Sequence, residues 1–144
     1  MKFTYTIQVC NESRELFSLL NFCANSQFHS EKANGEYIFG LDADEIPQEF
    51  LIKNIKRIIE DTGAEVIAVP RININPGYTE EFIKDHGFKI NELSWINWSD
   101  FQMRIYKKCD YIKWTEEMHT KLTGTDKIIG LQPQPSLTLW HKLI

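Results

Sequence analysis

Three acidic residues, Asp42, Asp44 and Glu45, stand directly after a short apolar run. The run, at residues 37–41, has no polar alternation, which predicts a strand buried on both faces. Pro47 follows the acids and suits the first turn of a helix, where its missing N–H is not needed. The three carboxylates are therefore expected where a strand ends and a helix begins. In open α/β sheets this is the edge at which ligands bind.

Two roles are open for carboxylates at this position. Hard divalent cations prefer oxygen ligands, and Mg²⁺-type ions are often held by one or two carboxylates together with substrate phosphates. Alternatively, the acids cap the helix and interact favourably with its dipole. Either way, desolvated carboxylates need a partner. An Asp-x-Asp triplet is too common to decide between these roles by itself.

The elements that must position the acids follow from the hydrophobic pattern. Gly63 predicts the end of a helix that begins at Pro47, Pro70 predicts the end of a buried strand, and residues 71–98 are expected to be irregular. The alternation of strands and helices predicts an α/β fold with a largely parallel, layered sheet. The expected order is strand 3–9, helix 12–23, strand 37–41, helix 47–61, strand 66–69, strand 101–107, helix 114–122 and strand 137–140.

Length and composition bound the class of protein. The chain has 144 residues, 42% of them hydrophobic and 25% charged, which predicts one globular domain. A net charge of −4 gives no basic field for nucleic acid, and no apolar run approaches the roughly 20 residues of a membrane span. The three cysteines lack metal-type spacing and are expected to be reduced, and residues 1–6 do not predict a signal peptide. We therefore expect a cytoplasmic protein.

The order of these elements resembles the family 2 glycosyltransferases, which have the GT-A fold of nucleotide-sugar enzymes. The most specific match is the stretch 34–45, NGEYIFGLDADE, which is similar to the family segment that carries its Asp-x-Asp motif. The resemblance implies a GT-A-like three-layer sandwich with a mostly parallel mixed sheet. The other matching segments are 5–12, the first strand and its Asn-Glu turn; 100–106; 114–119, where Thr120 follows in place of the usual Glu; and 139–141, the closing strand with its histidine.

The chain is shorter than the family pattern between its first strand and the Asp-x-Asp stretch. Relatives have two further strands and a helix there, and one of those strands contacts the nucleotide base. Residues 12–36 have room for one helix only, so we expect a sheet that has lost two edge strands. The first strand then lies at an edge, which tends to pair or be covered. Either it pairs across a homodimer, or residues 25–35 fold over it.

The resemblance also implies an activity. It is the transfer, with inversion, of a sugar from a nucleotide-diphosphate donor, expected to be a UDP-sugar, to a hydroxyl group of a glycan or other acceptor. Mn²⁺ or Mg²⁺ would bridge the diphosphate and offset the charge on the leaving group. By the resemblance Asp44 is the first metal ligand, Asp42 contacts ribose or a metal-bound water, and His141 is a further ligand. The alternative for His141 is a ring packed beside Trp140.

A direct displacement needs one base for the acceptor hydroxyl. Glu117 is the first candidate, with Glu116 and Asp100 behind it, although paired glutamates are also common on a solvated helix face.

Donor contacts are assigned by the same resemblance to Asn11, Glu12 and Arg104. Arg71 and Arg104 could each clamp a phosphate, but an arginine in a strand is more often paired with an acid.

Two other function classes remain open. One is a non-catalytic binding module that has lost its nucleotide pocket, and the other is a metal-dependent phosphoesterase that uses the same acids on water. The phosphoesterase requires more carboxylate or histidine ligands than this sequence offers. Loss of one wall of the base pocket predicts millimolar nucleotide affinity, about 4 kcal/mol of binding.

Overall fold

The computed structural model describes residues 1–8, 30–115 and 121–142. The predicted helix 12–23 and the candidates Asn11, Glu12, Glu116 and Glu117 lie outside the described residues. The described elements are β1 (Phe3–Gln8), β2 (Tyr37–Asp42), β3 (Glu45–Pro47), α2 (Glu49–Thr62), β4 (Val66–Ile74), α3 (Glu80–Asp85), β5 (Ile96–Lys107), β6 (Lys113–Trp114), β7 (Leu122–Thr123), β8 (Ile128–Gly130), the 3₁₀ turn η1 (Pro135–Leu137) and β9 (Leu139–Lys142).

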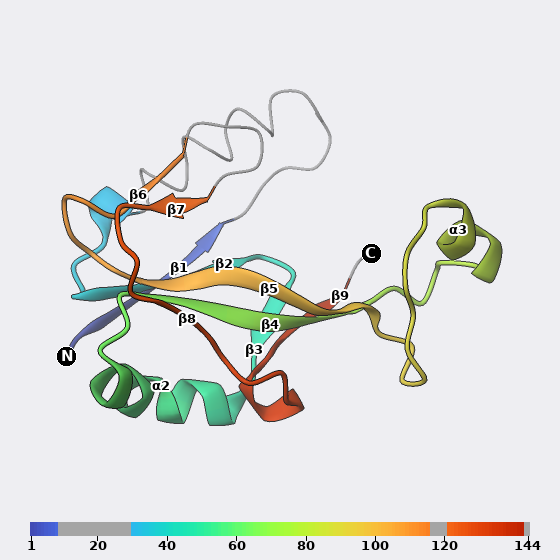
Figure 1. Ribbon diagram of the computed structural model, residues 1–144, viewed down its shortest axis with the longest axis horizontal. Coiled ribbons are helices and arrows are strands. Elements are labelled where there is room, and N and C mark those ends of the chain that lie inside the picture. The colour runs from blue at the N-terminus through green and yellow to red at the C-terminus, as the bar shows by residue number, and fades with distance from the viewer. Residues whose placement is uncertain (9–29, 116–120, 143–144) are drawn as a thin grey trace.

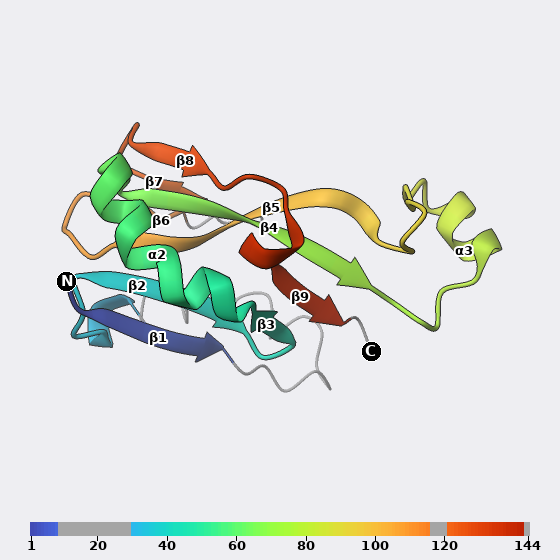
Figure 2. The same cartoon turned by 90° about the horizontal axis from the view of Figure 1, so that it is seen from below.

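The described strands form a curled mixed sheet in the order β1-β2-β5-β4-β9-β3, with β8 beside the first half of β4 (Figures 1 and 2). The α/β class and the mixed sheet are confirmed, but the parallel majority is not, since three pairings of the described sheet are parallel and three are antiparallel. β1 is parallel to β2, and β8 and β9 are parallel to β4, whereas β5 runs antiparallel to both of its neighbours and β3 runs antiparallel to β9. The reason is that the long arm after β4 returns the chain directly into β5, without a crossover helix.

β1 lies at one end of the strand order, as expected. It pairs in parallel with β2, from Phe3 opposite Tyr37 to Gln8 opposite Asp42. The chain before β2 approaches β1 closely, because the Gly35 N–H donates to Thr4 Oγ1 over 2.7 Å. A Cβ atom on Gly35 would lie 2.6 Å from the Thr4 nitrogen, so this contact requires glycine.

α2 covers one face of the sheet, and the small β6–β7 sheet lies on the other side (Figure 1). The buried residues of α2 are Leu51, Ile55 and Ile59, and they pack in the same cluster as Phe39 of β2. Each such side chain contributes about 1.5–3 kcal/mol on burial. The helix ends at Gly63, whose φ of 64° is left-handed and whose N–H bonds to the Ile59 carbonyl, as the sequence predicts.

The start of α2 corrects the expected strand-to-helix junction. Pro47 belongs to β3, and α2 begins at Glu49 with Gln48 as its N-cap. The three acids therefore lie in and beside the β2–β3 turn, and the alternative in which they cap the helix is wrong. A proline is acceptable in β3 because that strand lies at the far edge of the sheet.

Other elements also differ from the expectation, and β5 begins at Ile96 instead of at residue 101. β4 continues through Pro70 to Ile74. Pro70 falls between the part of β4 that pairs with β8 and the part that pairs with β9, where its missing N–H interrupts neither ladder. The helix expected at 114–122 is wrong at both of its ends, because Trp114 in β6 pairs antiparallel with Leu122 in β7, and residues 116–120 lie outside the described residues.

The segment between β4 and β5, residues 75–95, projects from one end of the sheet and is called the arm here (Figures 1 and 2). It contains α3, which the sequence did not predict and which is capped by the Thr79 hydroxyl on the Phe82 N–H. None of the described helices is long and apolar enough to cross a membrane.

Candidate functional site

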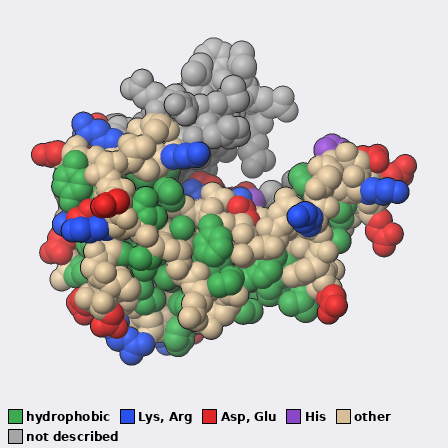
Figure 3. Space-filling model, viewed as in Figure 1, with side chains coloured by type: hydrophobic (Ala, Val, Ile, Leu, Met, Phe, Trp, Pro, Cys, Tyr) green, Lys and Arg blue, Asp and Glu red, His purple; other side chains and the backbone are tan. Residues whose placement is uncertain are grey.

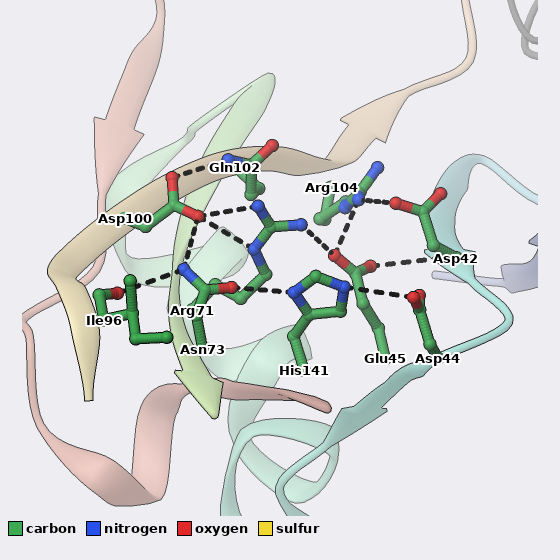
Figure 4. A network of polar contacts seen from close by, with 10 residues as sticks. All are labelled: Asp42, Asp44, Glu45, Arg71, Asn73, Ile96, Asp100, Gln102, Arg104 and His141. Carbon is green, nitrogen blue, oxygen red and sulfur yellow. Dashed lines mark hydrogen bonds and ion pairs between the residues drawn. The ribbon is translucent and has the colours of Figure 1, made fainter. Parts of the chain in front are cut away.

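Strand register brings the candidate residues together at one end of the sheet (Figure 4). Asp42 ends β2, and Glu45 opens β3 after a tight turn. β9 lies between β3 and β4, so that His141 stands opposite Glu45 on one side and opposite Asn73 on the other. The first acidic segment and the closing strand therefore meet, although they are far apart in sequence.

Asp44 is the most exposed residue of this site, and it contacts the nearly buried ring of His141. Asp44 Oδ2 lies 3.1 Å from His141 Nε2, and the two side chains are 39% and 10% exposed. His141 Nδ1 lies 2.7 Å from Asn73 Oδ1. The Asn73 amide nitrogen donates to Asp100 and to the Ile96 carbonyl, which turns its oxygen toward the ring. The ring thus donates from Nδ1, and the other ring nitrogen points toward the Asp44 carboxylate.

This pair of donors fits a divalent cation. A carboxylate such as Asp44 is a ligand type for Mg²⁺ or Mn²⁺, an imidazole such as His141 is a ligand type for transition metals, and their facing atoms lie 3.1 Å apart. The described residues contain no group of three or more His, Cys, Asp or Glu side chains arranged for a metal. An ion here would therefore complete its shell with waters and phosphate oxygens.

Glu45 is the buried centre of the network. Its side chain has no exposed surface, and its Oε1 accepts from Arg71 Nη1 at 3.0 Å and from Arg104 Nη2 at 2.6 Å. Its Oε2 accepts the Asp42 backbone N–H at 3.1 Å. A buried carboxylate is tolerated only with such partners. Glu45 therefore joins the β2–β3 turn to β4 and β5, and it holds the turn that carries Asp44.

Arg104 is held by acids on both sides. It pairs with Asp42 as well as with Glu45, and the whole residue is only 8% exposed. Burial lowers the pKa of Arg104, but the charges of Glu45 and Asp42 outweigh burial and leave the pKa raised. Its Nε is buried without a hydrogen-bond partner. Of the two roles considered from the sequence, these contacts favour pairing with acids over a phosphate clamp.

Asp42 has a pKa shifted upward. Burial raises the pKa of Asp42, the charge of Arg104 lowers it, and the neighbouring carboxylates of Glu45 and Asp44 raise it further. The carboxyl group of Asp42 is 27% exposed, so it can still reach a ligand.

Asp100 has the opposite shift. Burial raises the pKa of Asp100, but hydrogen bonds from Asn73, Arg71 and Gln102 and the charge of Arg71 outweigh it and lower the pKa. Arg71 reaches Asp100 Oδ2 with Nε at 2.9 Å and Nη2 at 2.7 Å. A carboxylate held ionised in this way is a weak proton acceptor at neutral pH. This environment disfavours Asp100 as the base, and the other two candidates, Glu116 and Glu117, lie outside the described residues.

The charges around the pair do not balance. Four carboxylates belong to the network, and two guanidinium groups face them, which leaves two negative charges in excess when the ring is neutral. Figure 3 shows acidic, basic and histidine side chains together in a hollow between the body of the molecule and the arm.

The structure thus brings together Asp42, Asp44, Asp100, Arg104 and His141, which were candidates from the sequence. Sequence reasoning missed Asn73, Gln102 and the central position of Glu45, and it treated Arg71 as a weaker candidate. A signal for two of these was present. Arg71 and Asn73 alternate with Ile72 and Ile74, the period of a strand with one polar face, although the segment was expected to be irregular.

Comparison with known proteins adds no family to this description. No family model matches the chain, and no curated protein matches its sequence.

Proposed function

We propose that this protein is a metal-dependent glycosyltransferase that moves a sugar from a nucleotide-diphosphate donor to an acceptor hydroxyl group, with inversion. The observation that carries the proposal is the approach of His141 Nε2 to Asp44 Oδ2, 3.1 Å apart across 97 positions of sequence. These are the two residues that the resemblance to family 2 glycosyltransferases names as ligands. Their spacing, the fixed ring tautomer and the excess negative charge all suit one divalent ion.

In this proposal each residue of the site has a separate role. Asp44 and His141 bind Mn²⁺ or Mg²⁺, which when bound offsets the charge that develops on the departing diphosphate. Asn73 keeps the His141 ring in the orientation that ligation needs. Asp42, held by Arg104, contacts the ribose or a metal-bound water. Glu117 takes the proton of the acceptor hydroxyl group.

Calorimetric titration with UDP and Mn²⁺, together and separately, tests the proposal. We expect UDP binding that requires Mn²⁺, and its loss in Asp44→Ala and His141→Ala. Asp61→Ala is the matched control, because Asp61 is an exposed acid at the end of α2. Asp44→Ala and Asp61→Ala should keep the thermal unfolding temperature of the parent within a few degrees, whereas His141→Ala should lower it, because it removes a buried ring that is bonded to Asn73. Unchanged Mn²⁺ and UDP affinity in Asp44→Ala would refute the assignment.

A non-catalytic binding module is the second candidate. It is favoured by the position of β1, because in the described part of the chain no strand lies outside β1 where the family has its base pocket. The same titration separates the two candidates. Metal-dependent nucleotide binding with sugar transfer supports the enzyme, and absence of nucleotide binding up to millimolar concentrations supports the module.

A further inference from the structure

A cavity of about 410 Å³ lies between the arm and the β4–β5 ribbon. Its lining includes His141, Asn73 and Asp100 but neither Asp42 nor Asp44, so it lies on the Asn73 side of the His141 ring (Figure 4). The volume is within the range of about 300–1,000 Å³ that is usual for small-molecule sites. The cavity therefore adjoins the proposed metal pair without being part of it.

One wall of the cavity is aromatic and belongs to the arm. Tyr78 and Phe88 both line it, with ring centroids 6.1 Å apart and planes inclined by 15°. Both residues are only partly buried. Their backbone N–H groups bond to the Asn75 and Ile83 carbonyls, and both rings pack against Phe82, with centroids 4.5 Å and 6.4 Å away. The arm thus presents two nearly parallel rings toward the sheet.

The sheet side of the cavity is mixed, because Ile96 and Phe101 of β5 line it together with polar side chains. Asp100, Asn97 and Ser99 line it beside His141. The Asp100 side chain is 25% exposed, and its Oδ1 accepts one bond, from Gln102 Nε2 at 2.7 Å, while Oδ2 takes the bonds from Arg71 and Asn73. A carboxylate oxygen with one partner can accept a further hydrogen bond. Hydroxyl groups of a ligand would find both acceptors and donors here.

We propose that this cavity binds the acceptor substrate as a sugar ring, with Tyr78 and Phe88 against the C–H face of the ring and the polar side chains of the sheet side on its hydroxyl groups. A pyranose has this division, since its faces carry C–H bonds and its edge carries hydroxyl groups. Aromatic rings with a few convergent polar groups suit such a ligand. The proposal rests on the proposed function, which puts the donor at Asp44 and His141 and therefore the acceptor beside them.

Saturation-transfer NMR on the full chain tests the cavity without reference to the donor. The probes are the methyl glycosides of glucose, galactose, mannose and N-acetylglucosamine at millimolar concentration. We expect transfer to the ring protons of at least one glycoside, and affinity for it weaker by about tenfold in Tyr78→Ala and in Phe88→Ala. Tyr78→Phe keeps the ring and should retain binding. Phe50→Ala is the matched control, because Phe50 is a 49% exposed aromatic on α2 outside the cavity.

Each result decides the proposal. No transfer to any of these glycosides, or equal transfer with Tyr78→Ala and the parent, would overturn it. Loss of UDP binding in Tyr78→Ala would also overturn it, because the cavity would then belong to the nucleotide. If Tyr78→Ala unfolds, Tyr78→Phe still tests the proposal. A folded Tyr78→Phe variant that no longer binds the glycoside would contradict stacking, because this variant keeps the aromatic ring. Glycoside binding in a protein that binds no UDP would uphold the sugar site and refute the transferase.

Discussion

Replacing Glu45 with glutamine should destabilise the protein severely, although the two side chains have nearly the same shape. Glu45 has no exposed side-chain surface and is the shared partner of Arg71 and Arg104. Both of its oxygens accept hydrogen bonds from N–H groups. A glutamine amide nitrogen would therefore face a donor in either orientation. The two arginines would also lose the one carboxylate that they have in common.

The size of the effect follows from burial. Removing one member of a buried ion pair costs about 3–5 kcal/mol, because the remaining charge stays desolvated. Domains are stable by about 5–15 kcal/mol in total. A loss of this size lowers Tm by roughly 10 °C for a chain of this length, at about 2–4 °C per kcal/mol. Asp42 and Asp100 remain near the arginines and limit the loss to the lower part of this range.

Urea and thermal unfolding followed by circular dichroism measure this loss. Glu49→Gln is the matched control, since Glu49 is 79% exposed and pairs with Lys53 on the surface of α2. Exposed pairs of this kind contribute about 0.2–1 kcal/mol at most. If Glu45→Gln and Glu49→Gln lowered the unfolding free energy by the same small amount, the reasoning that makes Glu45 the buried centre of the network would be refuted.

Three further predictions concern single side chains. Asn73→Ala should weaken Mn²⁺ binding by about 10–100-fold, because the His141 ring loses its 2.7 Å partner; calorimetry would detect this, and Asn54→Ala on the surface of α2 should leave affinity unchanged. The lowered pKa of Asp100 means that its contribution to stability is present above the usual value of 3.8 and is lost as pH falls below it. Asp100→Asn should therefore show a smaller loss of stability than the parent between pH 5 and pH 2, and an equal loss would contradict this. Glu117→Gln should lower turnover by roughly two orders of magnitude and spare UDP binding, whereas full activity would move the role to another acid.

Local patterns in the sequence were enough for the two elements that flank the acids, β2 and α2, but not for β3, which carries Glu45. The apolar run before Asp42 predicted β2, and the apolar stripe before Gly63 predicted α2. Both patterns can be recognised locally, because the residues that a strand or a helix buries recur at short, regular spacings in the sequence. Three acids in four positions also marked the candidate site. At Pro70 the proline interrupted the pattern, and local reasoning ended the strand too early. At 114–122 the pattern was short, and local reasoning predicted a helix.

Tertiary structure alone decided how the site is assembled. The pairing of β9 with both β3 and β4 puts His141 beside Asp44 and Asn73, and no local period encodes a contact across 97 positions. The same pairing buries Glu45 among two arginines from other strands, whereas in the sequence it is one of three similar acids. The sequence determined which side chains are available for metal and phosphate chemistry. Strand register determined which of them are buried and paired and which remain open to a ligand, because only the folded sheet fixes the distance between segments remote in the chain.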